Sequence, residues 1–158
     1  MKYYRSILLA LLIATATVAG AKARYVFYFI GDGMGMGHVN ATQYYNRMVL
    51  GNEEPLLMMQ FPVASHAWTY SASSPVTDSA AAGTALSTGF KTNNYMIAMS
   101  PDSTTHYKSI ARTLKDEGWG VGILTSVAPD DATPAAFYAN RLDRGMHAGI
   151  DEDAIKSG

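Results

Sequence analysis

The sequence predicts an α/β fold built on a mostly parallel sheet, and three apolar segments carry this prediction. Residues 25–30 form an unbroken run of β-branched and aromatic side chains, which is typical of a strand covered on both faces. Residues 63–70 and 121–124 are two further candidate strands. Because helical segments separate these strands, right-handed crossovers and parallel pairing are expected.

Four segments are expected to be helical. Residues 39–50 are predicted to form a helix closed by a glycine, and residues 105–117 space apolar side chains at helical intervals before a second glycine. A helix of small residues is expected to begin near Ser79. The turn at residues 129–134 contains two prolines and starts a further helix through Tyr138.

The start of the chain predicts export. A positively charged beginning is followed by an apolar run at residues 7–18 and then by small residues. We therefore expect residues 1–21 to be a secretory signal peptide, cleaved near Ala21 or Ala23. The apolar run is shorter than the ~20 residues that span a bilayer, so no stable membrane span is expected after cleavage. The mature chain is expected in the periplasm or outside the cell, with an uncleaved anchor as the alternative.

The composition excludes several classes of function. The 158 residues carry a net charge of -1, and Lys and Arg form no basic run, which argues against nucleic-acid binding. Cysteine is absent, so the chain has neither disulfides nor a thiolate metal site. Any bound metal must use oxygen or imidazole ligands, which favours a carboxylate-rich site for zinc or magnesium.

Ser79 is the strongest candidate for a reacting side chain. It stands where the small-residue helix is expected to begin. The unpaired N–H groups and the positive dipole end of a helix start suit an alkoxide or a bound phosphate. The alternative is a helix cap at Ser79 or Asp78, since both residue types are favoured caps.

Asp32 is a candidate metal ligand. It follows the first predicted strand and lies between two glycines, which let the backbone turn and present the carboxylate to a cleft. A plain turn aspartate is the alternative. The surrounding glycines fail the G-x-G-x-x-G pattern in either register, so a nucleotide cofactor is not expected.

The segment around the last predicted helix supplies further candidates. Asp131 and Thr133 lie two residues apart, so their oxygens could reach one cation such as magnesium, whereas helix capping is the alternative. Sites in α/β sheets form beyond the carboxyl ends of strands, so this segment is expected to converge with Asp32. Arg144 follows the helix, and a guanidinium suits phosphate oxygens, although spacing alone does not exclude Arg141.

Four segments together closely resemble the alkaline phosphatase family. In chain order they are residues 29–35 (F-I-G-D-G-M-G), 76–81 (V-T-D-S-A-A), 87–92 (S-T-G-F-K-T) and 131–136 (D-A-T-P-A-A). The resemblance implies an alkaline-phosphatase-like three-layer sandwich. By the same comparison, residues 24–158 are the N-terminal portion of the domain, and its C-terminal half is absent.

The resemblance also implies an activity. Members of the family hydrolyse phosphate monoesters through a phosphoserine intermediate, assisted by two zinc ions and one magnesium ion. The implied roles are nucleophile and zinc ligand for Ser79, zinc and magnesium bridge for Asp32, magnesium site for Asp131 and Thr133, phosphate clamp for Arg144, and orientation of that arginine for Asp78. A homodimer is implied for the complete protein.

The chain departs from the family pattern in composition and in length. Tyr95 stands where a glycine is frequent, and Asn140 replaces a common histidine. The other zinc ligands and the magnesium glutamate belong to the absent half, so the chain alone is expected to bind zinc weakly and to hydrolyse monoesters poorly. The alternatives to a phosphatase are a catalytically silent fragment and an exported phosphate-binding module.

Overall fold

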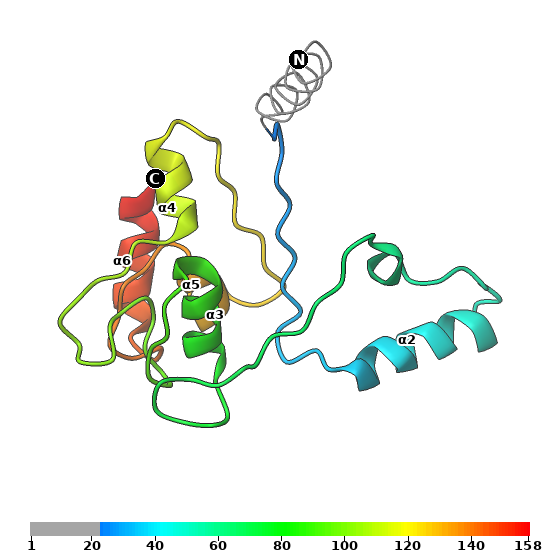
Figure 1. The fold of residues 1–158 in the computed structure, drawn as a ribbon. Helices are drawn as coiled ribbons and strands as arrows, with labels where there is room; N and C mark the ends of the chain where they lie inside the picture. The colour runs from blue at the N-terminus through cyan, green and yellow to red at the C-terminus, as the bar shows by residue number, and fades with distance from the viewer. Residues whose placement is uncertain (1–22) are drawn as a thin grey trace, which may run out of the picture. The chain divides into compact units, whose positions relative to one another are not determined.

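The computed structural model describes residues 23–158, so the signal peptide predicted at residues 1–21 lies outside the described residues. The described part contains five α-helices and one 3-10 helix (Figure 1). In chain order these are α2 (Met36–Met48), η1 (Leu57–Gln60), α3 (Ser79–Thr88), α4 (Ile110–Asp116), α5 (Ala132–Ala135) and α6 (His147–Ser157). Over the same residues, no helix is both long enough and apolar enough to cross a membrane.

No regular β-strand is present among residues 23–158, so the predicted parallel sheet stays a prediction. The three predicted strands have no regular pairing, and many of their apolar side chains are exposed: Phe27 is 79% exposed, Trp68 91% and Leu124 95%. The pairing present in the described part consists of two isolated antiparallel bridges elsewhere in the chain. A strand must pair its N–H and C=O groups with a neighbouring strand, and no such regular pairing is present for these segments among residues 23–158.

The helix predicted near Ser79 is confirmed as α3. Its N-cap is Asp78, whose Oδ1 accepts a hydrogen bond from the Ala81 N–H at 2.9 Å. The helix is closed by Gly89, which has a left-handed φ of 78°. Ser79 is therefore the first helical residue, and Asp78 takes the capping role.

The other predicted helices are present with shifted bounds. α2 begins earlier than expected, because the His38 Nδ1 accepts a hydrogen bond from the Gly35 N–H at 3.2 Å. α4 begins later, because Ser109 caps its first turn by accepting the Arg112 N–H at 3.2 Å. α5 ends before Tyr138 and is only 4 residues long. α6 was not predicted, and no side chain caps its start.

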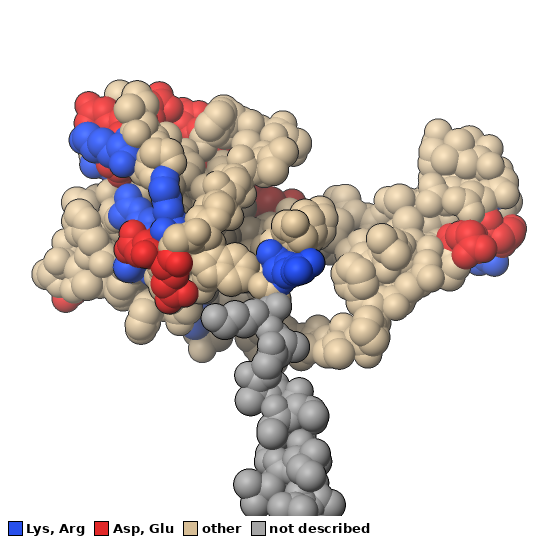
Figure 2. All heavy atoms as spheres, turned by 90° about the horizontal axis from the view of Figure 1, so that it is seen from above, with Lys and Arg blue, Asp and Glu red and all other residues tan. Residues whose placement is uncertain are grey.

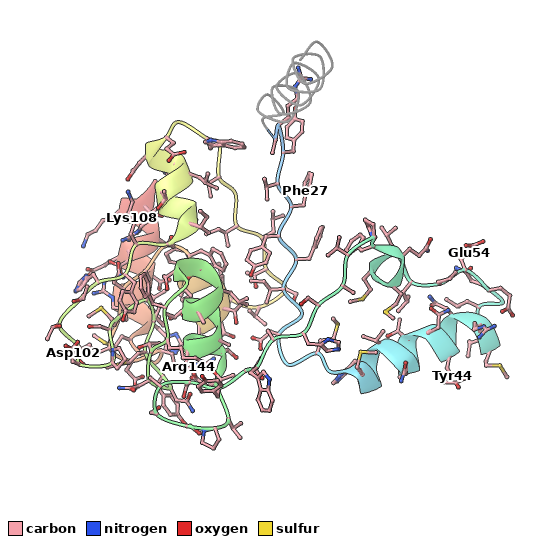
Figure 3. All side chains as sticks on the ribbon, in the orientation of Figure 1. Phe27, Tyr44, Glu54, Asp102, Lys108 and Arg144 are labelled. Atoms are coloured by element: carbon pink, nitrogen blue, oxygen red, sulfur yellow. The ribbon has the colours of Figure 1, made fainter. Side chains whose placement is uncertain are left out.

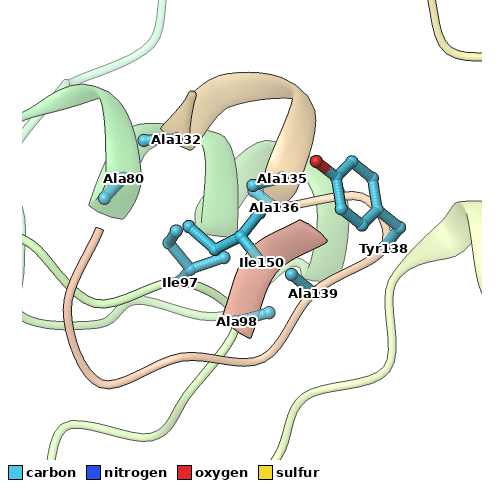
Figure 4. Close-up of a cluster of buried hydrophobic side chains, with 9 residues drawn as sticks. All are labelled: Ala80, Ile97, Ala98, Ala132, Ala135, Ala136, Tyr138, Ala139 and Ile150. Carbon is cyan, nitrogen blue, oxygen red and sulfur yellow. The ribbon is translucent and has the colours of Figure 1, made fainter. Parts of the chain in front are cut away.

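Small side chains form the core around α3, α5 and α6 (Figure 4). Ala80 of α3, Ala135 of α5 and Ile150 of α6 are all 0% exposed. Gly83 allows α3 and α5 to approach closely, because a Cβ there would lie 3.1 Å from the Ala136 Cβ and 3.4 Å from the Thr133 Cα. This contact fixes the position of α5, and thus of Thr133, against α3.

Charged side chains of both signs are interspersed on the surface. On the face drawn in Figure 2, most Lys and Arg side chains lie among Asp and Glu side chains. One such pair, Arg141 with Asp153 at 2.8 Å, ties the segment before α6 to that helix. The mixture accords with the net charge of -1.

Candidate active site

Asp32 joins the start of α3 to α5. Its Oδ1 accepts a hydrogen bond from the Ser79 Oγ at 3.2 Å, and its Oδ2 accepts one from the Thr133 Oγ1 at 2.8 Å. The convergence expected between Asp32 and the segment around α5 is therefore confirmed for Thr133. One carboxylate stands between two hydroxyl groups that come from different helices.

Ser79 occupies the helix start that the sequence predicts for it. It is the first residue of α3 and is half-buried. Backbone N–H groups in the first turn of a helix lack internal partners, and the positive end of the dipole lies there. These groups favour negative charge near the Ser79 Oγ. While Ser79 carries its proton, the hydrogen bond that it donates to Asp32 keeps the oxygen in place.

Arg144, which is labelled in Figure 3, is held by two carboxylates. Its Nη2 donates to the Asp131 Oδ1 at 2.8 Å, and its Nη1 lies 3.4 Å from the Asp78 Oδ2. Because Asp78 directly precedes Ser79, this pair places the arginine beside the start of α3. The Arg144 side chain is 30% exposed, and a guanidinium has five N–H donors, so donors remain for a bound anion.

Arg141, the alternative phosphate clamp, lies in a different environment. Its Nη2 donates to the Asp153 Oδ1 at 2.8 Å and also contacts the Gly149 carbonyl oxygen. Both partners belong to α6. The geometry therefore associates Arg144, rather than Arg141, with the start of α3.

Asp131 has the capping role that was the alternative to cation binding. It is the N-cap of α5, and its Oδ1 accepts the Ala132 N–H at 2.7 Å. The same oxygen accepts a hydrogen bond from the Arg144 Nη2. Of the two residues expected to reach a magnesium ion, Thr133 is hydrogen-bonded to Asp32, and Asp131 is joined to Arg144.

Two residues at this site were not predicted from the sequence. His147 places its Nδ1 2.7 Å from the Asp130 Oδ2, and both residues line a hollow beside Arg144. Tyr95 donates its backbone N–H to the Asp78 Oδ2 at 3.0 Å. The sequence could have indicated His147, because it lies three residues after Arg144. It could not have indicated the Tyr95 contact, because that contact is made by a backbone N–H group.

The oxygen atoms around Asp32 fit part of a metal site. Asp32, Ser79 and Thr133 offer one carboxylate and two hydroxyl groups, which are the hard donors that magnesium prefers. Catalytic zinc normally takes three protein ligands. Within residues 23–158, no group of three or more His, Cys, Asp or Glu side chains could hold one ion. Asp32, Ser79 and Thr133 are therefore oxygen donors of the kind that suits magnesium, without a second carboxylate or an imidazole among them.

Comparisons with known proteins point to one family. The family model for alkaline phosphatase matches residues 23–158. Alkaline phosphatase 4 of Drosophila melanogaster is 37% identical over 135 residues, which cover 78% of this chain and 22% of that protein. A cold-active alkaline phosphatase from a psychrophilic Shewanella sp. is 34% identical with a TM-score of 0.75, covering 81% of this chain and 32% of its own.

A mutant alkaline phosphatase of the Antarctic bacterium TAB5, described with Mg bound in its M3 site, is 32% identical with a TM-score of 0.69. That match covers 80% of this chain and 35% of the TAB5 chain. The present chain therefore spans about a third or less of the length of these relatives. The structural matches show the alkaline-phosphatase-like fold, and the family model spans all the described residues. The chain belongs to the alkaline phosphatase family.

Proposed function

We propose that this chain is the nucleophile-bearing portion of an enzyme that hydrolyses phosphate monoesters through a phosphoserine at Ser79. One observation carries the proposal: the Ser79 Oγ lies at the start of α3, hydrogen-bonded to Asp32. The same carboxylate binds Thr133. Family membership supports phosphate monoester hydrolysis in general terms.

The reaction we propose has two displacements at phosphorus. In the first, a bond forms between the Ser79 Oγ and phosphorus while the ester O–P bond breaks. The proton of the Ser79 hydroxyl passes to solvent, and the leaving alkoxide takes a proton from solvent. In the second, water attacks phosphorus and gives one proton to solvent, while the bond to the Ser79 Oγ breaks. The Ser79 alkoxide takes a proton from solvent, and inorganic phosphate leaves. The remaining N–H donors of Arg144 would bind the phosphoryl oxygens, which carry the shared charge of the transition state.

Two zinc ions and one magnesium ion are the cofactors that we infer for the complete protein. Asp32 and Ser79 would contribute to a zinc site, and Asp32, Asp131 and Thr133 to the magnesium site. Bound cations would stabilise negative charge on the attacking and leaving oxygens. The TAB5 relative described with Mg supports a role for metal in this family.

We infer a larger architecture for the complete protein. Residues 24–158 would form the N-terminal portion of a three-layer sandwich with a mostly parallel sheet, and a C-terminal portion would supply the missing metal ligands. The complete protein would be a homodimer that is exported to the periplasm or the extracellular space. The exposed predicted strands, with Trp68 91% exposed, support the presence of further pairing segments.

Replacement of the nucleophile tests the proposed reaction. In the complete protein, Ser79→Ala should lower hydrolysis of a chromogenic phosphate monoester by about a thousandfold or more, and phosphoserine formation should be lost. The matched control is Ser126→Ala, because Ser126 is an exposed serine outside the helices of residues 23–158. Equal turnover by Ser79→Ala and the parent would show that the nucleophile is another group.

An exported module that binds phosphate without turnover is the second candidate. It is favoured by an accessible, ion-paired Arg144 together with a zinc ligand set that is incomplete within residues 23–158. Both functions require phosphate binding, so turnover discriminates them. Phosphate binding without phosphoserine, in the complete protein supplied with zinc and magnesium, would support the binding module.

A further inference from the structure

The backbone of Tyr95 connects the two residues that carry the Asp78–Arg144 ion pair. Its N–H donates to the Asp78 Oδ2 at 3.0 Å, and its carbonyl oxygen accepts the Arg144 backbone N–H at 2.7 Å. The Arg144 Nη1 returns to the same Asp78 Oδ2 at 3.4 Å. These three contacts form a closed loop of hydrogen bonds. Arg144 is therefore held through its backbone as well as through its guanidinium.

The turn that carries Tyr95 has an unfavourable backbone conformation. The Met96 N–H donates to the Asn93 carbonyl oxygen at 3.2 Å, which closes a four-residue turn, and Tyr95 at its third position has a φ of 72°. Glycine is the preferred residue at a position of this kind, and any side chain there costs conformational free energy. Tyr95 is 59% exposed, so packing of its ring contributes little stability to offset that conformational cost.

The same turn also holds the backbone of Asp78. The Asn94 Oδ1 accepts the Asp78 N–H at 3.2 Å, and the Asn94 Nδ2 donates to the Val76 carbonyl oxygen at 3.0 Å. Asp78 is the N-cap of α3, and Ser79 is the next residue. The turn therefore contacts the segment that presents Ser79 on one side and Arg144 on the other.

We propose that Tyr95 is a positioning residue whose left-handed backbone sets the placement of Arg144 relative to the start of α3. A guanidinium held in advance loses less freedom when it binds phosphate than a mobile one does. The inference rests on the proposed phosphate-binding role of Arg144. It adds that the geometry of the clamp depends on the backbone angle at Tyr95 and not on the tyrosine ring.

The test measures the affinity of the 158-residue chain for inorganic phosphate in variants at Tyr95. Tyr95→Val should weaken phosphate binding by about tenfold. A β-branched residue disfavours positive φ, so the closed loop of hydrogen bonds to the charged groups would open. Tyr95→Ala should bind within about twofold of the parent, since the exposed ring is dispensable. Tyr95→Gly should retain the affinity and raise the melting temperature.

A matched control separates positioning from general destabilisation. Ser103 is an exposed residue with a φ of 64°, and its backbone N–H donates to the Ser100 carbonyl oxygen, away from Asp78 and Arg144. Ser103→Val should therefore lower the melting temperature without changing phosphate affinity. Affinities are compared at equal folded fraction, measured by circular dichroism.

A double-mutant cycle gives the decisive readout. If Tyr95 acts through Arg144, Tyr95→Val should have no further effect on phosphate affinity in an Arg144→Ala background. Equal weakening in both backgrounds, or full affinity of Tyr95→Val, would overturn the inference and leave the proposed function standing. Unchanged affinity of Arg144→Ala, or no phosphate binding by the parent chain, would instead overturn the proposed role of Arg144 and the inference with it.

Discussion

The cluster around α3 and the predicted strands are both rich in apolar residues, but they differ in how far those residues are buried. In the cluster, Ala80, Ile97 and Ala135 are 0% exposed. In the predicted strands, Trp68 is 91% exposed and Leu124 is 95% exposed. A helix satisfies its backbone within its own segment, whereas a strand depends on partners that come from elsewhere. Ser79 and Thr133 therefore rest on locally encoded helices with capping side chains, whereas Asp32 and Arg144 lie in turns.

The largest expected effect compares one buried and one exposed aliphatic side chain. Ile97→Ala should lower the free energy of unfolding by about 2–5 kcal/mol, because Ile97 is fully buried and its removal leaves a cavity. Leu124→Ala should change it by less than about 0.5 kcal/mol. Urea unfolding followed by circular dichroism measures both values. Similar losses in the two variants would contradict the difference in packing between the regions.

A smaller effect is expected from a methyl group at the contact between α3 and α5. Gly83→Ala should lower the free energy of unfolding by about 1 kcal/mol, because the new Cβ would lie 3.1 Å from the Ala136 Cβ, which is attached directly to backbone. The control is Gly37→Ala in α2, where a Cβ meets open space. That change should stabilise the chain by about 0.5–1 kcal/mol. Equal stabilisation by both changes would show that the helix contact is looser than described.

A third effect concerns the pH dependence of the cluster. Burial first, and then the charges of Asp130, Asp151 and Asp153, raise the pKa of Tyr138 from 10.0 to about 12. The folded state therefore favours the neutral phenol, whose hydroxyl donates to the Pro129 carbonyl oxygen. The resulting stability is fully present below pH 10 and is lost as the pH rises toward 12. Thermal unfolding between pH 9 and about pH 12 should show this loss in the parent and less of it in Tyr138→Phe.

The residues that the sequence located correctly share a local signal. The small-residue run after Asp78 predicted the start of α3 at Ser79, and the expected convergence of Asp32 with the segment around α5 is confirmed by its hydrogen bond to Thr133. The chemical roles of these residues stay predictions. Two clear signals, a helix start and a turn after an apolar run, were sufficient to identify the neighbourhood of the site.

Other features could not be predicted, for physical reasons. Regular strands at residues 63–70 and 121–124 require pairing with segments distant in the sequence, which a local pattern does not specify. α6 begins without a capping side chain, so its start has no local signature. Tyr95 meets Asp78 through a backbone N–H, a group that nearly every residue carries.

A titration of the isotopically labelled chain with inorganic phosphate, followed by NMR of the backbone amides, tests the central claim most directly. The claim is that the start of α3 and the Arg144 guanidinium form a phosphate site within this chain. The account predicts that shifts concentrate at Ser79–Ala81 and around Arg144, with little change at residues 63–70 and 121–124. Shifts that are absent at saturating phosphate, or that concentrate away from the start of α3, would contradict it.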